Sequence, residues 1–516
     1  MFLHESIARS AQRHPDKPAV FFRDHVLTYA QLWGAVQAAA AGFRDNLGIQ
    51  PGDRVGIVLP NVPQFVIAYH ALSQLGAIAV PVNPLLKAPE IQYIWNNAGV
   101  VAAITFPMLL QAVMEAKGGI PSLRDILIVG ADSDLPEGIK PFDSMLKPPT
   151  APLPSPAISP EDPAVFIYTS GTTGFPKGVM LTHRNILSNI ESCQAHLEFG
   201  NDEVILTVLP LFHSFGQTVC MNYMLWLGGA ICLVERFTPA LVLENIEKRR
   251  VTIAAMVPAM YGAILQTPME REYDLSSLKF CVSGGSPMPE PLQLAFESKF
   301  NCAILEGDGP TECSPVTSVN PIPGKGSRKI GSVGVPVPGV EIKIFDDDDR
   351  ELPQGEIGEI VVRGPNVMKG YYNDPESTAE AMRSGWYHTG DMGRFDEDGY
   401  LYIVDRKKDM IIVGGINVYP SEVENSLLRH PAVADVAVIG LHDAERGEIP
   451  CAVIVPKPGV EADAKEIMAW CRHQMAIYKA PRQVIFRTEL PRSATGKVVK
   501  RLLKKELEME QGMTEE

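Results

Sequence analysis

The stretch YTSGTTGFPKGV, from Tyr168 to Val179, is the starting point for interpreting this chain. It contains three glycines, four Ser or Thr residues and one lysine, and it directly follows an apolar run, Ala164 to Tyr168, that predicts a buried strand. Glycine allows a backbone to approach a polyanion closely, and the amide hydrogens then form an anion-binding nest. The hydroxyls add donors and Lys177 adds a positive charge. The stretch therefore predicts a phosphate-binding loop between a strand and a helical segment.

This loop differs from the common P-loop, which needs Gly, four residues and then Gly-Lys-Ser/Thr. Pro176 precedes Lys177 and Gly178 follows it, so that pattern is absent. The stretch instead resembles the signature of the adenylate-forming enzymes, which include acyl-CoA synthetases, luciferases and peptide-synthetase adenylation domains. The resemblance implies that the loop binds ATP or AMP. The residues it assigns to this role are Thr169, Ser170, Gly171, Thr172, Thr173, Gly174 and Lys177.

Composition limits the class of protein. The chain has 516 residues, which is enough for two or more domains. Its composition of 46% apolar and 21% charged residues is ordinary for a soluble enzyme. A net charge of −15 argues against nucleic-acid binding, although a transient membrane contact stays open. The eight cysteines show no metal-ligand spacing and indicate a reducing, cytoplasmic location. The uncharged stretch Gly216 to Val234 contains a Gly-Gly break and predicts a buried helix, turn and strand rather than a membrane span.

The order of apolar runs predicts an α/β fold. Short apolar strands alternate with helical segments from residue 1 to about 160 and again from Ala164 to Gly309, which predicts two parallel-type sheet subdomains covered by helices. After about residue 320, runs such as VEIKIFD and GEIVVRG separated by Gly, Pro and Asp predict a small antiparallel barrel. The run Asp346 to Asp349 lacks the Gly and Glu positions of an EF-hand and predicts a solvated hairpin turn.

The pattern of predicted helices and strands changes again after Arg406. One helix, two strands, another helix, a strand and a basic terminal helix predict a small α+β domain, and the resemblance to the adenylate-forming enzymes implies that this domain is mobile. We therefore expect an N-terminal domain over residues 1–406 and a C-terminal lid domain over residues 407–516. In the adenylate-forming family the stretch DRKKDMIIVGGINVYP holds the interdomain hinge, which the resemblance assigns to Lys408.

Five further segments resemble the remaining motifs of that family, in the family order. LPLFHSFG, Leu209 to Gly216, matches the segment whose aromatic or His side chain forms one wall of the acyl pocket, here His213. SGGSPMP, Ser283 to Pro289, matches the turn that lies against adenine and the acyl group, because Gly284 and Gly285 permit a close approach. The resemblance implies an acyl pocket lined by Phe212, His213, Phe215 and Val257.

The segment EGDGPTECSP, Glu306 to Pro315, matches the family form aromatic-Gly-x-Thr-Glu. The match implies that Gly309 lies at the nucleotide, that Thr311 donates to the α-phosphate and that Glu312 ligates Mg²⁺. Asp308 stands where an aromatic residue usually stacks on adenine. A carboxylate at this position can accept a hydrogen bond from the adenine amino group, or water can fill the space. We expect ATP use to survive, at a cost of about 1 kcal/mol for one stacking contact.

Two segments complete the set. WYHTGDMG with the later Asp-Arg pair implies that Asp391 accepts both ribose hydroxyls and that Arg406 reaches the ribose or phosphate. PRSATGKVVK implies that Lys497 is the catalytic lysine. The hinge region adds Gly414, Gly415 and Ile416, which match the loop lining the pantetheine channel of coenzyme A.

Together the motifs imply an AMP-forming acid–CoA ligase. It would use ATP with Mg²⁺ to convert a carboxylic acid to acyl-AMP and then transfer the acyl group to coenzyme A. The apolar pocket segments favour a medium- or long-chain fatty acid, and the chain resembles bacterial fatty-acid–CoA ligases. An aromatic acid, a carrier protein as acceptor and a non-catalytic relative are the alternatives, and the oligomeric state is open.

Overall fold

The fold comes from a computed structural model that describes residues 1–131, 135–149, 153, 156–170, 175–268, 271–443, 446–492 and 498–510. The chain forms two compact units. The large unit comprises Met1–Ile342 and Val362–Tyr387, and the small unit comprises Lys343–Val361 and His388–Glu516. The predicted division at residues 406 and 407 remains a prediction.

One eight-stranded sheet of the large unit contains the strands that flank the phosphate loop. Its order is β19 (Gly370–Tyr371), β9 (Pro176–Thr182), β8 (Pro163–Ser170), β4 (Ile78–Pro81), β3 (Arg54–Ile57), β5 (Val100–Thr105), β6 (Asp125–Ile128) and β7 (Ile139–Pro141). The strands from β8 to β7 are parallel, whereas β9 and β19 add antiparallel pairs at one edge.

The expectation of a helical segment directly after the phosphate loop is wrong. The loop joins β8 to the antiparallel strand β9, and the helix begins only at His183. The residues PKGVMLT form this strand, whose register with β8 runs from Pro176 opposite Ser170 to Thr182 opposite Pro163. Thr182 caps the helix by accepting from the backbone N–H of Asn185.

A nine-stranded sheet forms the second subdomain of the large unit. Its order is β16 (Val335–Pro336), β15 (Ser318–Val319), β14 (Ala303–Asp308), β13 (Phe280–Ser283), β12 (Ile253–Met256), β10 (Val204–Thr207), β11 (Ala230–Leu233), β1 (Pro18–Phe22) and β2 (His25–Thr28). The strands from β14 to β1 are parallel, as the alternation of strands and helices predicted, and the edges are antiparallel.

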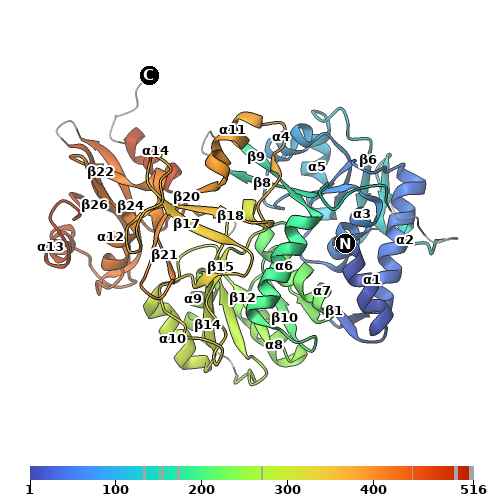
Figure 1. The fold of residues 1–516 in the computed structure, drawn as a ribbon, viewed down its shortest axis with the longest axis horizontal. Helices are drawn as coiled ribbons and strands as arrows, with labels where there is room; N and C mark the ends of the chain where they lie inside the picture. The colour runs from blue at the N-terminus through green and yellow to red at the C-terminus, as the bar shows by residue number, and fades with distance from the viewer. Residues whose placement is uncertain are drawn as a thin grey trace. The chain divides into compact units, whose positions relative to one another are not determined.

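Helices cover both sheets of the large unit, with α8, α9 and α10 beside β10, β12 and β14 (Figure 1). The bounds of the α-helices are α1 (Leu3–Arg13), α2 (Tyr29–Leu47), α3 (Pro63–Leu75), α4 (Ala88–Ala98), α5 (Leu110–Lys117), α6 (His183–Leu197), α7 (Tyr223–Leu227), α8 (Pro239–Arg249), α9 (Pro258–Gln266), α10 (Glu290–Phe300) and α11 (Pro375–Ala381). Short helical turns are η1 (Pro107–Leu109), η2 (Phe142–Met145), the π-helix η3 (Gly216–Asn222), η4 (Thr311–Cys313) and η5 (Arg383–Gly385). Trp95 and Tyr261 are fully buried in two separate apolar cores under these helices.

A four-stranded sheet lies mostly within the small unit. Its order is β17 (Glu341–Phe345), β18 (Gly358–Arg363), β20 (Tyr387–Phe395) and β21 (Leu401–Arg406), and β20 pairs antiparallel with β21. The run Asp346 to Asp349 forms the predicted hairpin turn, in which the Asp346 carboxylate accepts from the backbone N–H groups of Asp348 and Arg350.

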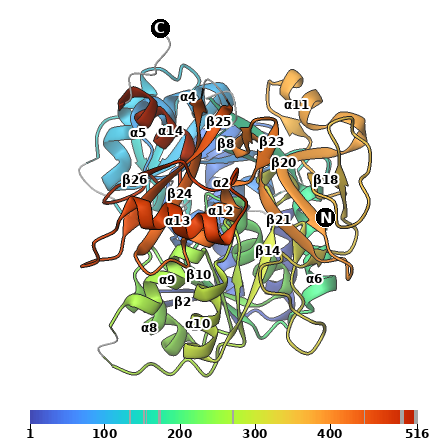
Figure 2. The same cartoon turned by 90° about the vertical axis from the view of Figure 1, so that its left-hand side faces the viewer.

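A five-stranded sheet forms the rest of the small unit. Its elements are η6 (Lys407–Asp409), β22 (Ile411–Val413), β23 (Ile416–Val418), α12 (Pro420–Leu427), β24 (Val433–Asp443), β25 (Gly447–Pro456), α13 (Ala464–Gln474), β26 (Gln483–Phe486) and α14 (Lys500–Glu510). Successive strand residues face opposite sides, so Val436 and Val438 pack with residues of α12 and α13 while Ala437 and Ile439 pack with residues of α14. Figure 2 shows these three helices around β24.

The eight cysteines and most of the uncharged stretch from Gly216 to Val234 are buried. All eight cysteines are buried and free, and the sulfurs of Cys281 and Cys302 lie 3.7 Å apart. Within the described ranges, no helix has the length and apolar content needed to cross a bilayer. The uncharged stretch from Gly216 forms η3 and α7 and then the buried strand β11, which is the predicted helix, turn and strand.

Candidate active site

The phosphate loop begins and ends on paired strands of the large unit. Thr169 and Lys177 face each other across the β8–β9 pair. The Lys177 ammonium donates to the Ser377 hydroxyl at 2.6 Å and lies 5.4 Å from the ring centre of Tyr371. Both contacts hold the charge beside the loop entrance. The loop residues Gly171, Thr172, Thr173 and Gly174 and the side chain of Ser170 lie outside the described part of the chain.

Glu312 is the residue at which several motifs meet. It lies in η4, which begins after the two residues that follow β14, and it is 8% exposed. Its Oε1 accepts hydrogen bonds from the Tyr371 hydroxyl at 3.1 Å and from the Thr169 hydroxyl at 3.4 Å. Burial, together with the adjacent Glu312 charge, raises the pKa of Tyr371 well above its usual range, so this phenol stays a proton donor. The glutamate is thus buried but hydrogen-bonded next to the phosphate loop.

Thr311 connects this cluster to the predicted acyl wall. Its hydroxyl lies 3.2 Å from the hydroxyl of Ser214, in the LPLFHSFG segment. In the same segment the rings of Phe212 and His213 have centres 4.6 Å apart and are both partly exposed. The hydroxyl contact therefore joins the residue predicted to bind the α-phosphate to the segment predicted to bind the acyl group.

The glycines of SGGSPMP lie against the same segment. A Cβ on Gly284 would come within 3.2 Å of the Phe215 ring, and one on Gly285 would lie 3.6 Å from Val257. Gly285 also has φ +81°, which side chains rarely adopt. Phe215, Val257 and the two glycines are therefore neighbours, as the acyl pocket hypothesis requires.

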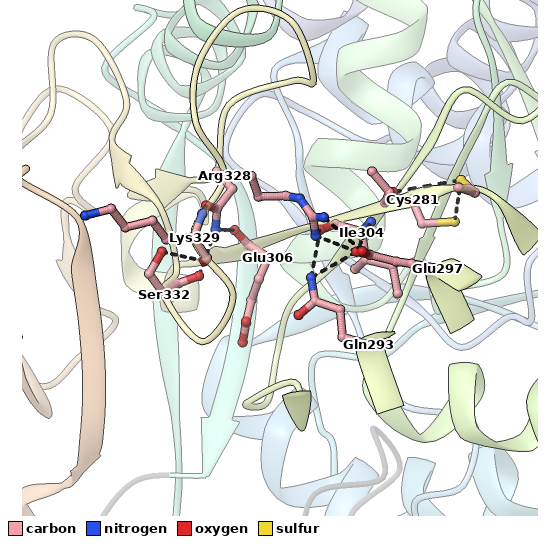
Figure 3. Close-up of polar contacts among 11 residues, drawn as sticks. Cys281, Gln293, Glu297, Ile304, Glu306, Arg328, Lys329 and Ser332 are labelled. Carbon is pink, nitrogen blue, oxygen red and sulfur yellow. Dashed lines mark hydrogen bonds and ion pairs between the residues drawn. The ribbon is translucent and has the colours of Figure 1, made fainter. Parts of the chain in front are cut away.

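Gly309 has a clear packing reason to be glycine. A Cβ at this position would lie 1.6 Å from the backbone oxygen of Pro315, so no side chain fits. Upstream, the Glu306 carboxylate accepts from the backbone N–H of Met288 at 2.9 Å. Burial and the adjacent Asp308 charge raise the pKa of Glu306 to about 7. Figure 3 shows Glu306 beside the polar cluster that holds β14.

The small unit holds the predicted ribose residues. Asp391 on β20 and Arg406 at the end of β21 are register partners, and the Arg406 Nε lies 3.2 Å from the Asp391 Oδ1. The backbone N–H of Asp391 donates to the Thr389 hydroxyl, and the N–H of Gly390 donates to the Glu359 carboxylate. These contacts fix the strand so that the carboxylate and guanidinium are presented together.

The predicted hinge and coenzyme A residues lie next to each other in the small unit. Lys408 is exposed in η6, and the following hairpin of β22 and β23 turns at Gly414 and Gly415. Their φ values of +57° and +83° match a two-residue turn that favours glycine. Ile416 is 48% exposed beside this turn. The proposed catalytic Lys497 lies outside the described residues.

Three residues in or near the site, two in the large unit and one in the small unit, were not predicted. Tyr371 hydrogen-bonds Glu312 from 59 positions away, and Ser377 binds Lys177 from 200 positions away. Neither residue type forms a local pattern, so spacing alone gave no signal. In the small unit Lys407 was also missed; it pairs with Glu359 at 3.2 Å and Asp347 at 2.8 Å.

Comparison with known proteins agrees with this geometry. A family model described as AMP-binding enzyme matches residues 7–372, and one described as AMP-binding enzyme C-terminal domain matches residues 422–497. The long-chain-fatty-acid–CoA ligase of Bacillus subtilis (strain 168) is 41% identical, covering 98% of this chain and 94% of the relative. The feruloyl-CoA synthase of Amycolatopsis sp is 39% identical, covering 95% and 96%.

A solved structure gives the same result. The crystal structure of the anthranilate CoA ligase AuaEII in complex with anthranoyl-AMP has a TM-score of 0.92 and 30% identity, covering 99% of this chain and 98% of that one. The chain belongs to the AMP-binding enzyme family. Within it, the chain is one of the adenylate-forming acid–CoA ligases, the acyl-CoA synthetases.

Proposed function

We propose that this enzyme activates a medium- or long-chain fatty acid. Phe212, Phe215 and Val257 provide an apolar wall, and none of the Arg or Lys side chains in the described ranges is fully buried. A second substrate carboxylate would therefore find no buried cation to pair with, and an unpaired buried charge is costly. This observation, with the 41% identity to a long-chain-fatty-acid–CoA ligase, supports a monocarboxylate with a hydrocarbon chain.

The first reaction joins two anions. The acid carboxylate attacks the α-phosphorus of ATP, the bond to pyrophosphate breaks, and acyl-AMP forms. Like charges repel by several kcal/mol even at an effective dielectric constant of about 20. The hydroxyls of Thr169 and Thr311, the loop amides and Lys177 supply donors that offset this repulsion, and Lys497 supplies a second mobile charge. Asp391 and Arg406 would hold the ribose.

The residues around Glu312 suit a magnesium ion bound with ATP. The Glu312 carboxylate is buried, and the groups that hydrogen-bond it are the hydroxyls of Thr169 and Tyr371. Mg²⁺ in nucleotide enzymes is bound by one or two carboxylates plus substrate phosphates. In the described part of the chain, no cluster of three or more His, Cys, Asp or Glu could form a protein-only metal site. When bound, Mg²⁺ would neutralise phosphate charge, and Glu312 would orient it.

The second reaction transfers the acyl group to a thiol. The sulfur attacks the acyl carbonyl of acyl-AMP, the bond to AMP breaks, and a thioester forms. We assign coenzyme A as the thiol, with Gly414, Gly415 and Ile416 along its arm, and Lys408 as the hinge between domains 1–406 and 407–516. The exposed Gly-Gly turn supports this assignment, since it allows a chain to pass close to the backbone.

An aromatic acid is the second candidate substrate. The adjacent rings of Phe212 and His213 offer a stacking surface, and one relative is a feruloyl-CoA synthase. The carrier-protein alternative shares the first reaction but not the use of coenzyme A.

Mass spectrometry of the products tests these assignments. The enzyme is incubated with ATP, Mg²⁺ and a panel of fatty acids of increasing length plus ferulic and anthranilic acids, with and without coenzyme A. We expect fatty acyl-CoA only when coenzyme A is present. Preferred conversion of the aromatic acids would refute the fatty-acid assignment, and accumulation of acyl-AMP that coenzyme A does not consume would refute the assigned acceptor.

A further inference from the structure

Asn61 is a buried polar residue that the proposed chemistry does not use. It lies between β3 and α3 and is 4% exposed. Its Nδ2 donates to the backbone oxygens of Thr207 at 3.0 Å and Leu209 at 2.9 Å. Its Oδ1 accepts from the backbone N–H of Leu211 at 3.0 Å. One side chain from the first subdomain therefore fixes three backbone groups in the second.

The segment that Asn61 holds leads directly to the proposed acyl wall. Phe212 and His213 follow Leu211, and the next residue, Ser214, contacts Thr311. The aromatic pair is thus held between a buried amide on one side and a hydroxyl contact on the other. A shift of this backbone would move the acyl wall relative to the proposed α-phosphate site.

Asn320 performs the same task for the nucleotide segment. It follows β15 and is 1% exposed. Its Nδ2 donates to the backbone oxygens of Glu306 at 3.0 Å and Ser332 at 2.7 Å, and its Oδ1 accepts from the backbone N–H of Lys329 at 3.0 Å. Figure 3 labels these three partner residues, of which Glu306 belongs to β14. The held strand leads through Asp308 to Thr311.

The two amides have matched chemistry. Each uses both N–H donors and one oxygen lone pair on three backbone groups, all buried except the partly buried N–H of Lys329, and loss of a buried partner leaves such groups unsatisfied. Only the segments they hold differ. We propose that Asn61 and Asn320 are positioning residues that separately set the acyl half and the nucleotide half of the site; this rests on the proposed function.

Paired substitutions test the proposal. N61D and N320D keep the side-chain shape and one acceptor but lose both donors, and N61A and N320A remove the amide without adding charge. Far-UV circular dichroism and thermal melting establish that each variant is folded at the assay temperature. KM and kcat are then measured for the acid at saturating ATP, and for ATP at saturating acid, together with the preference among chain lengths.

We expect the Asn61 variants to raise KM for the acid by about tenfold and to flatten the chain-length preference, while KM for ATP changes by less than about twofold. The Asn320 variants should instead raise KM for ATP by about tenfold, while KM for the acid changes by less than about twofold and the chain-length preference is kept. Equal rises in both KM values, a fall in kcat alone, or unfolding of all four variants would overturn the proposal. If the wild-type enzyme prefers an aromatic acid, the fatty-acid assignment fails, and the same comparison made with that acid still tests the two asparagines.

Discussion

At the residue scale, the hydroxyl of Tyr371 is the contact most directly tied to the proposed chemistry. It lies 3.1 Å from the Glu312 carboxylate and stays protonated because its pKa is raised by burial and by that carboxylate. Y371F removes this donor while the ring and its contact with Lys177 remain. We expect adenylation to slow by about tenfold and to need more Mg²⁺, the scale of one hydrogen bond to a charged group.

Pyrophosphate release measured across a Mg²⁺ titration checks this expectation. Y372F is the matched control, because it removes a hydroxyl from the next residue, whose ring packs on Phe166 with centres 4.6 Å apart. An unchanged magnesium dependence in Y371F would show that the phenol does not position Glu312.

Lys497 permits a test that separates the two reactions. We expect K497A to abolish adenylation, because a positive charge at the developing phosphate charge is lost, and to leave thioester formation from supplied acyl-AMP largely intact. Each reaction is measured alone, the first by pyrophosphate release and the second by acyl-CoA formation. K500A is the control on the neighbouring helix, where Lys500 pairs with Glu424. Equal loss in both reactions would contradict the role given to Lys497.

At the element scale, the sequence predicted strands better than the connections between them. The alternation of apolar strands and helical segments predicted between Ala164 and Gly309 corresponds to β10 to β14 and their helices, because buried parallel strands are continuous apolar segments. The strand β9 was missed, since the Gly, Pro and hydroxyl residues before it indicate a loop but carry no information about the element after that loop. Residues such as Asn61 and Tyr371 were also missed, because each acts on a partner distant in the chain, and a single Asn or Tyr forms no pattern.

The strand-to-turn connection after β14 gives a prediction at this scale. G309A places a methyl group against the Pro315 backbone oxygen, which cannot move as a side chain can. We expect the melting temperature to fall by several degrees, since overpacking costs about 1–3 kcal/mol, and adenylation to fall with it because Thr311 follows directly.

G34A is the control for this substitution. Gly34 is exposed within α2 and a Cβ added there would have no neighbouring atom within 4 Å, so alanine should raise stability by up to about 1 kcal/mol. Thermal melting of both variants checks the pair. A melting temperature in G309A equal to wild type would show that the turn adapts.

At the scale of the whole molecule, the changing pattern of apolar runs along the sequence predicted the α/β sheets, the small antiparallel sheet and the terminal α+β segment. The place of Val362–Tyr387 in the large unit has no local sign in the sequence, because this segment lies far along the chain from the strands that it joins. Pairing of β19 with β9 shows the reason, since backbone hydrogen bonds between distant segments leave no local trace in the sequence.

Acid stability is a property of the whole large unit. His4 on α1, His70 on α3 and His183 on α6 are all buried, and burial followed by mutual charge repulsion lowers the pKa of His70 and of His183 to about 3. Burial likewise lowers the pKa of His4 to about 4. Because these folded pKa values lie below the unfolded value of about 6.5, the unfolded chain binds more protons, and stability falls as the pH drops below about 6.5.

Substituting one of these histidines tests the effect. Neither ring nitrogen of His70 has a hydrogen-bond partner, so H70L loses no buried hydrogen bond. Between pH 6.5 and 5, we expect wild type to lose about 1 kcal/mol per pH unit more unfolding free energy than H70L, because one fewer proton is taken up on unfolding. Denaturant unfolding at several pH values measures this slope. H14Q, at an exposed position, is the control and should follow wild type, whereas equal slopes in wild type and H70L would show that His70 is already protonated in the folded chain.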